Sequence, residues 1–284
     1  MLPPRPSRRF CPRHAFPATR RRCTVAYQTR LEIHTVKKWL PLACMLLLAP
    51  VARAETLNLV GSSWPPFSEQ SLPSNGMASE LVAEAMRRAG YETKFVVGNW
   101  ERIAQGAGMG LGGVIIGIWR TEERAQTLAF SKPYLQNVIR VAKLRDTDYT
   151  FQQLLGGERK DLAMGLVRDF AYGDILDQFD KHPRFMENQL QQVILKLRQG
   201  RIDFTVGSEL ALRYSIDTYF PIDAGKFALS PPIALRGLRI AVSLQHPEHA
   251  TIISRFETAM EEMKGDGTYH RIIDPYRKPA SATR

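Results

Sequence analysis

The sequence predicts a mixed α/β protein with two similar lobes around a shared crevice, and two observations lead to this fold class. From residue 56 onward, short apolar segments typical of strands alternate with helical stripes, an order that favours a sheet with a parallel core. Segments 110–117 and 200–207 also correspond, because each combines a glycine turn, an apolar strand and a glycine at the strand's end. Open α/β sheets bind ligands at such carboxyl ends of strands, so we expect the binding site there.

The first lobe is expected to contain strands at 56–60, 93–97 and 114–118. A helix lies between the first two, because apolar residues recur at helical spacing and Gly90 follows where a C-cap is expected. The apolar stripe of this helix consists of Ala78, Leu81, Val82, Ala85, Met86 and Ala89.

The second lobe repeats the pattern, with strands expected at 162–167 and 202–206. The helix between them should stop at Gly200, and its apolar face consists of Leu190, Val193, Ile194 and Leu197. The chain then returns through an extended segment, 229–241, into a last helix that Gly265 should cap. The apolar stripe of that helix is Ile252, Ile253, Phe256, Ala259, Met260 and Met263.

Two segments are expected to cross between the lobes, near 139–143 and near 232–238. Two crossings imply a hinge, with the C-terminal segment returning to the first lobe. We therefore predict that lobe 1 comprises residues 55–140 and 236–284, and that lobe 2 comprises residues 141–235.

Residues 1–54 differ in composition from the rest of the chain. They hold eleven of the 39 Lys and Arg residues but only one of the 28 acidic residues, so the remainder carries a net charge near +1. A basic patch for nucleic acid is therefore not expected. Lys37 and Lys38 precede an apolar run too short to span a membrane, and Ala52-Arg53-Ala54 fits a cleavage site.

This leader is interpreted as a secretory signal peptide at 36–54, cleaved after Ala54, with an uncleaved membrane anchor as the alternative. Residues 1–35 show no periodicity, and we expect that they are not translated and that synthesis starts at Val36. All three cysteines lie in the leader, at Cys11, Cys23 and Cys44, and Cys44 fits a lipoprotein signal poorly. A mature chain without cysteine excludes disulfides, thiol nucleophiles and cysteine-based metal sites.

Motifs for catalysis and cofactors find little support. The pattern Gly108-x-Gly-x-x-Gly113 has the spacing of a dinucleotide fingerprint, but it follows a helix-like segment and precedes a strand, the reverse of what such a site needs. The four histidines after the leader lack ligand-like spacing with carboxylates, and no Gly-x-Ser-x-Gly elbow occurs. We therefore expect no cofactor, no metal ion and no catalytic residue.

The segment 117–134 is the most informative part of the sequence. An expected strand ends there in a charged loop that carries Arg120 and Arg124. Trp64, Trp100 and Trp119 also follow expected strand ends. An aromatic wall encloses apolar or planar parts of a ligand, and a guanidinium binds a carboxylate bidentately. The alternatives are a solvated turn for the loop and core packing for the tryptophans.

From about residue 55 to 276 the chain resembles the family 3 extracellular solute-binding proteins, which are two-lobed periplasmic receptors for polar amino acids and related solutes. The resemblance rests on the aromatic–Pro–Phe turn 64–67, the helix start 76–81, the Thr121-x-x-Arg124 motif with the block 130–134, the turn 200–203 and the segment 265–276. It implies the two-lobed periplasmic binding protein fold, with a hinge of two crossing segments and a central ligand cleft.

The resemblance also implies partners and a site. We expect a periplasmic monomer that captures a small anionic or zwitterionic solute and docks on the membrane permease of an ABC transporter. In such receptors the arginine at position 124 clamps the α-carboxylate, helped by backbone near Gly117, while the loop 168–172 faces the cleft from the second lobe. The expected ligand-binding residues are Trp64, Phe67, Trp100, Gly117, Trp119, Arg124, Arg168, Phe170, Tyr172 and Ser208.

Three positions depart from the family pattern. Trp119 stands where the receptors usually carry a small hydroxyl residue, and Gly113 stands where Asp is common. Ser208 occupies the place of the carboxylate that usually holds the α-ammonium group, with Glu209 next to it. A ligand with a carboxylate and no free amine, or a larger aromatic ligand, is compatible with this pattern.

Two further functions are compatible with the resemblance. A cyclohexadienyl dehydratase-like enzyme would need a carboxylic acid of raised pKa in the cleft, a role for Glu209 or Asp169. A ligand-sensing partner of a membrane receptor would use the same binding chemistry for a different client.

Overall fold

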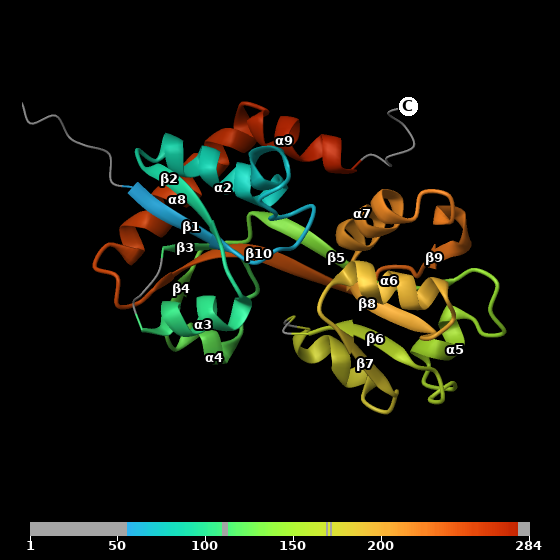
Figure 1. Cartoon of the computed structure of the whole chain (residues 1–284). Coiled ribbons are helices and arrows are strands. Elements are labelled where there is room, and N and C mark those ends of the chain that lie inside the picture. The colour runs from blue at the N-terminus through green and yellow to red at the C-terminus, as the bar shows by residue number, and fades with distance from the viewer. Residues whose placement is uncertain (1–55, 110–112, 169, 171, 278–284) are drawn as a thin grey trace, which may run out of the picture. The chain divides into compact units, whose positions relative to one another are not determined.

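The computed structural model describes residues 56–109, 113–168, 170 and 172–277, and it shows a mixed α/β chain built on a ten-stranded sheet (Figure 1). The strands are β1 Thr56–Gly61, β2 Glu92–Val97, β3 Val114–Ile118, β4 Leu128–Phe130, β5 Leu135–Leu144, β6 Met164–Val167, β7 Arg184–Glu187, β8 Phe204–Ser208, β9 Phe227–Leu229 and β10 Ala234–Ser243. The helices are α2 Met77–Arg88, α3 Trp100–Gly108, α4 Glu122–Ala125, α5 Phe151–Leu155, α6 Leu190–Arg198, α7 Glu209–Tyr219, α8 His249–Gly265 and α9 Thr268–Arg277. Short 3-10 turns lie at Pro73–Asn75, Gly173–Phe179 and Ala224–Lys226.

The strand order is β2-β1-β3-β10-β5-β8-β6-β7, with β4 added to β10 and β9 added to β5. In each half of this order, parallel pairs form the outer part: β1 with β2 and β3 in one half, and β6 with β7 and β8 in the other. The long strands β5 and β10 run antiparallel to each other and join the halves. The predicted fold class, a two-lobed α/β fold with two connecting segments, is confirmed. The residue boundaries given above for the lobes stay a prediction.

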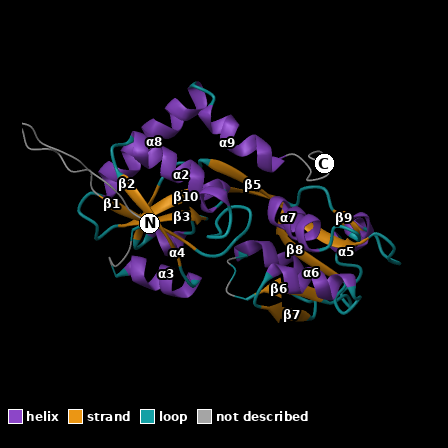
Figure 2. Cartoon of the chain, turned by 45° about the horizontal axis from the view of Figure 1, so that its top comes forward, coloured by secondary structure: helices purple, strands orange, loops and turns teal. Residues whose placement is uncertain are grey.

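Two helical layers cover the first half of the sheet. Figure 2 shows α8 and α9 on one side of β1, β3 and β10, and α3 on the other. Burial explains the arrangement, because β3 is apolar on both faces: Val114 and Ile116 join the core beneath α2 and α8, whereas Ile115 and Ile118 join the core beneath α3. The predicted stripes of α2 and α8 form the first of these cores.

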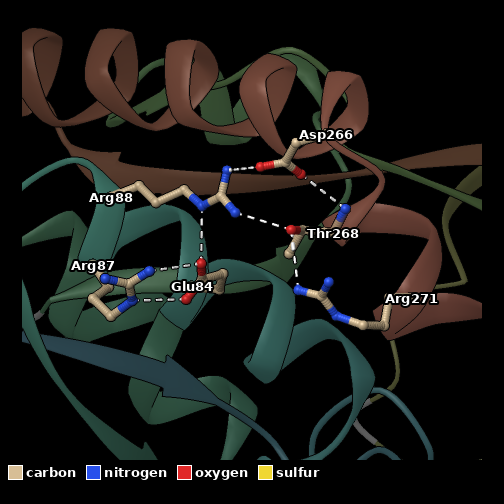
Figure 3. Close-up of polar contacts among 6 residues, drawn as sticks. All are labelled: Glu84, Arg87, Arg88, Asp266, Thr268 and Arg271. Atoms are coloured by element: carbon tan, nitrogen blue, oxygen red, sulfur yellow. Dashed lines mark hydrogen bonds and ion pairs between the residues drawn. The ribbon is translucent and has the colours of Figure 1, made fainter.

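The C-terminal end of the fold differs from the sequence prediction. Gly265 was expected to cap the last helix, but α8 includes Gly265 and a further helix, α9, follows after Gly267, whose φ is +80°. Figure 3 shows the polar contacts that hold this turn against α2. Arg88 pairs with Asp266 at 2.6 Å and with Glu84 at 2.9 Å, and its guanidinium also donates to the Thr268 hydroxyl at 2.9 Å.

In the second half of the sheet, the boundaries of two strands differ by a few residues from those predicted. The strand expected from residue 162 starts at Met164, and the strand expected at 202–206 is β8, which spans 204–208. Ile202 precedes β8, and Gly207 lies inside it. Phe204, Thr205 and Val206 of β8 are all buried, because β5 and β6 pair with β8 on its two edges and helices cover it.

Two features of the described part of the chain bear on function. None of its helices is both long enough and apolar enough to cross a membrane. In the same ranges, no group of three or more His, Cys, Asp or Glu side chains could hold a metal ion. The predicted leader, its cysteines and the cleavage after Ala54 lie outside the described residues.

Candidate functional site

Two adjoining cavities lie at the carboxyl ends of strands from both halves of the sheet. The smaller has a volume of about 50 Å³ and the larger about 510 Å³. The smaller is lined by Ser62, Trp64, Trp100, Gly117, Ile118, Trp119, Arg124 and Phe170. Ser62, Trp64, Trp100 and Phe170 line both cavities, so the two share an aromatic wall.

Arg124 is the cation of the smaller cavity. The short helix α4 presents it, and Thr121 caps that helix by accepting a hydrogen bond from the Arg124 N–H at 3.2 Å. The guanidinium donates to the Trp119 carbonyl at 2.9 Å, and its Cζ lies 5.0 Å from the Trp100 ring centre. Burial lowers the pKa of Arg124, against a smaller opposing effect of Glu123, but an arginine side chain stays charged.

No ion pair found among the described residues involves Arg124, although a guanidinium carries five N–H donors. Its neighbour Arg120 differs, because it pairs with Glu122 at 2.5 Å on the exposed side of the loop and lines neither cavity. A partly buried arginine without an anionic partner is suited to bind a carboxylate from solution.

Trp64 is held by the turn that follows β1. Backbone hydrogen bonds of 2.6 Å and 3.0 Å between Trp64 and Ser68 close this turn. The carbonyl groups of Pro66 and Phe67 accept from the first N–H groups of α2, at 2.9 Å and 2.8 Å. Gly76 allows this close approach, because its φ is +98° and an added Cβ would lie 2.8 Å from both carbonyl oxygens.

Aromatic contacts connect the two sides of the site. The Trp64 ring stacks on Phe67 with a centroid separation of 4.2 Å and meets the edge of Phe170 at 5.3 Å. Phe67 is 1% exposed and lines neither cavity, so it supports Trp64 from the core side. The Trp119 indole N–H is buried and has no hydrogen-bond partner in the described part of the protein.

The second lobe supplies the far wall of the larger cavity. Arg168, Phe170, Tyr172 and Ser208 line it. The Tyr172 hydroxyl accepts a hydrogen bond from the Val167 N–H at 2.8 Å, which fixes the ring across the end of β6. Arg168 is exposed, and its Nε lies 3.4 Å from the Asn188 side-chain oxygen. Nine of the ten residues expected at the site thus line a cavity, with Phe67 behind them, while their contact with a ligand stays a prediction.

Glu209 does not fit either role considered for it from the sequence. It lines neither cavity, and it pairs with Arg140 at 2.6 Å and with Arg213 at 2.9 Å. Burial raises the pKa of Glu209, but the hydrogen bonds from the two arginines more than offset this and leave the pKa below its usual value. Glu209 is therefore an ionised structural carboxylate. Asp169, the other acid considered, lies outside the described residues.

Sequence reasoning missed Glu69 and the cavity-facing side of α7. Among the described residues that line the two cavities, Glu69 is the one carboxylate, and it accepts hydrogen bonds from the Ser63 hydroxyl and from the Ser71 N–H at 3.3 Å. The residues of α7 at the larger cavity are Ala211, Tyr214, Ser215 and Tyr219. A signal for the helix existed, because Ser208, Ala211 and Ser215 have the spacing of one helical face.

The fold and this cavity arrangement agree with a family match. The chain belongs to the bacterial extracellular solute-binding proteins, family 3, whose model matches residues 59–279. The resemblance inferred from the residues is thereby confirmed.

Individual relatives give a more detailed comparison. The chain is 28% identical over 164 residues to "ABC transporter arginine-binding protein 1" of Escherichia coli (strain K12), an alignment that covers 57% of this chain and 65% of the relative. The chain thus spans less than two thirds of the length of the curated relatives that it matches. A variant of ArgBP from T. maritima superposes with a TM-score of 0.62 at 25% identity, over 78% of this chain and 94% of that one.

A third likeness concerns the fold alone. An ancestral amino-acid-binding protein, described as a precursor of cyclohexadienyl dehydratase, superposes with a TM-score of 0.64 at 19% identity. The alignment covers 78% of this chain and 95% of that one.

Proposed function

We propose that this protein is a periplasmic solute-binding protein that captures a small carboxylate-bearing ligand, an amino acid or an analogue, for an ABC-type importer. Arg124 carries the proposal. Its guanidinium faces a cavity, is half-buried, and has no ion-pair partner within the described ranges. A hydrogen-bonded pair with a charged partner contributes roughly 1.5–3 kcal/mol, so a ligand carboxylate at Arg124 accounts for a tenfold to hundredfold gain in affinity.

The aromatic wall defines the rest of the ligand site. Trp64 and Trp100 come from the first lobe and Phe170 from the second, and all three line both cavities. A ligand between them would contact both lobes at once. Because only interactions that differ between two conformations shift their populations, contacts with both lobes are what hinge closure requires. A closed, ligand-bound form is the state that a permease would recognise.

Arginine is the first ligand to test. The E. coli relative is named for arginine, and Glu69 supplies a carboxylate in the larger cavity of this chain. A cationic side chain could pair with Glu69 while the ligand's carboxylate pairs with Arg124. Export to the periplasm rests on the predicted signal peptide at 36–54 and on the family, and we expect the mature protein to act as a monomer.

The test begins with a thermal-shift screen of amino acids, carboxylates and amines against the chain starting at Glu55, followed by calorimetry. We expect Arg124→Ala to weaken binding of the tightest ligand at least tenfold. Arg120→Ala is the matched control, because it removes an arginine of the same loop that lines neither cavity. Unchanged affinity in Arg124→Ala would rule out the carboxylate clamp.

One acid considered for the enzymatic alternative, Glu209, is not suited to that role. A dehydratase needs a protonated acid in the cleft, whereas Glu209 has a lowered pKa and lines neither cavity. A sensor role would use the same site with another client, and a pull-down with the permease or receptor encoded beside this chain distinguishes the two.

A further inference from the structure

The N-terminus of helix α7 lies in the wall of the larger cavity. Ser208, the last residue of β8, is the N-cap residue of this 11-residue helix, and its side chain makes no capping hydrogen bond. The first N–H groups of a helix have no acceptor within the helix, and that end carries a partial positive charge. A helix start of this kind favours an oxygen acceptor over a cation.

Two buried hydroxyl groups lie on the same side of this helix. Ser208 is 3% exposed and Ser215 is 2% exposed, and neither hydroxyl has a hydrogen-bond partner in the described ranges. Both residues line the larger cavity together with Ala211. Their spacing of three and seven residues places them on one face of α7, which is therefore the face toward the cavity. Buried hydroxyl groups normally find a partner, so these two point to a ligand group.

The charges around this end are unfavourable for an ammonium group. The Glu209 carboxylate is shared by Arg140 and Arg213, and Arg213 also interacts with Asp217, so these four side chains balance and leave no surplus negative charge for an ammonium group. Arg168 lines the same cavity and adds another cation. Glu69, the carboxylate of the larger cavity, is nearer to the other end of α7. There it acts on Tyr219, the last residue of the helix, whose pKa is raised by burial, by Tyr214 and by Glu69. Eleven residues of helix separate Ser208 from Tyr219, about 16 Å at 1.5 Å per residue.

We propose that the N-terminal end of α7, with the Ser208 hydroxyl group, binds the 2-keto oxygen of the ligand, so that the protein prefers 2-oxo acids to the corresponding amino acids. Ser215 lies seven residues further along the helix, about 10 Å away, and would contact a more distant polar group of the ligand. This inference rests on the proposed function, in which Arg124 holds the ligand's carboxylate. An ammonium group bound at this end of α7 would need a carboxylate of the protein as its partner. The proposal instead places there a ligand oxygen that accepts hydrogen bonds.

Matched ligand pairs test the proposal. Calorimetry on the chain starting at Glu55 would compare L-arginine with 5-guanidino-2-oxopentanoate, L-glutamate with 2-oxoglutarate, and L-phenylalanine with phenylpyruvate. In each pair that binds, we expect the 2-oxo acid to bind at least tenfold more tightly. An amino acid that binds as well as or better than its 2-oxo partner overturns the proposal, and so does a failure of all six compounds to bind.

Variants locate the effect at Ser208. Ser208→Ala should weaken binding of the preferred 2-oxo acid about fivefold, the effect of one lost hydrogen bond. Ser79→Ala is the control, because Ser79 is also buried with an unpartnered hydroxyl but lies on α2 and lines neither cavity. Equal affinities of Ser208→Ala and Ser79→Ala would contradict the assignment.

A further substitution, Ser208→Asp, should reduce the preference for the 2-oxo acid at least tenfold, with folding checked by the melting temperature. A preference unchanged in folded Ser208→Asp counts against the proposal. If Arg124→Ala abolishes binding but an amino acid is preferred, the proposed function stands and this inference fails. If Arg124→Ala has no effect, the proposed function itself fails.

Discussion

Removal of the Trp100 ring should weaken ligand binding through Arg124. The ring centre lies 5.0 Å from the Arg124 Cζ, and the indole is part of the wall of both cavities. Cation–π contacts contribute about 0.5–1 kcal/mol when exposed and about 2 kcal/mol when desolvated. Arg124 is half-buried, so we expect a coupling near 1 kcal/mol between these two residues, together with a fivefold to tenfold loss of affinity in Trp100→Ala.

A double-mutant cycle measures this coupling. Trp100→Ala, Arg124→Ala and the double variant would be compared with the unaltered protein by calorimetry on the tightest carboxylate ligand. The double variant should bind about as weakly as Arg124→Ala, because the ring then has no guanidinium to orient. Losses that simply add, with a coupling below about 0.3 kcal/mol, would show that Trp100 only adds surface to the wall and does not position Arg124.

Two further predictions concern stability. Gly113→Ala should destabilise the first lobe severely, because a Cβ at Gly113 would lie 1.8 Å from the Asn58 carbonyl oxygen of β1. If the variant has the melting temperature of the unaltered protein, the backbone relaxes freely at this position and the prediction is wrong. Hydrogen bonds from Arg87 lower the pKa of Glu84 to about 2, and those from the Thr268 backbone and Arg88 lower the pKa of Asp266 to about 2. Both pKa values lie below those of the unfolded chain, near 4, so this stabilisation is present above about pH 4 and is lost as the pH falls toward 2. Glu84→Gln with Asp266→Asn should therefore lower the melting temperature at pH 7 but reduce its loss between pH 5 and pH 3, and a parallel pH profile would contradict this.

Local patterns predicted most of the fold. The stripes of α2 and α8 and the strands β1 and β3, which precede Trp64 and Trp119, follow from hydrophobic spacing, because their burial depends on short-range periodicity. Helix α9 was missed because it follows α8 after a two-residue turn and contains Pro275, which reads as a helix breaker. The burial of three successive residues of β8, Phe204, Thr205 and Val206, depends on its neighbours β5 and β6, which are distant in sequence.

The candidate site was predictable where a residue follows a strand end, as Arg124 and Trp119 do, because parallel strands bring their carboxyl ends to one edge. Glu69 and Glu209 were not predictable in this way. Glu69 reaches the cavity through the conformation of the loop between β1 and α2, and one of the two arginine partners of Glu209, Arg140, is 69 residues away in sequence. Whether an acidic side chain serves the ligand or the fold depends on such long-range partners.

Arg124 and Glu209 show the physical difference between a charge that is available to a ligand and a charge that is used by the fold. Both are partly buried charges on helices that follow the corresponding segments 110–117 and 200–207: Arg124 lies on α4 and Glu209 begins α7. Glu209 has two arginine partners, so the fold itself satisfies its charge. Arg124 has a carbonyl and an aromatic ring as neighbours, and neither carries a compensating negative charge. The folded protein therefore bears a desolvation cost at Arg124 that Glu123 only partly offsets, and a bound carboxylate would reduce it. Binding at this site should stabilise the fold as well as occupy the cavity, which is why a thermal-shift screen is the appropriate first measurement.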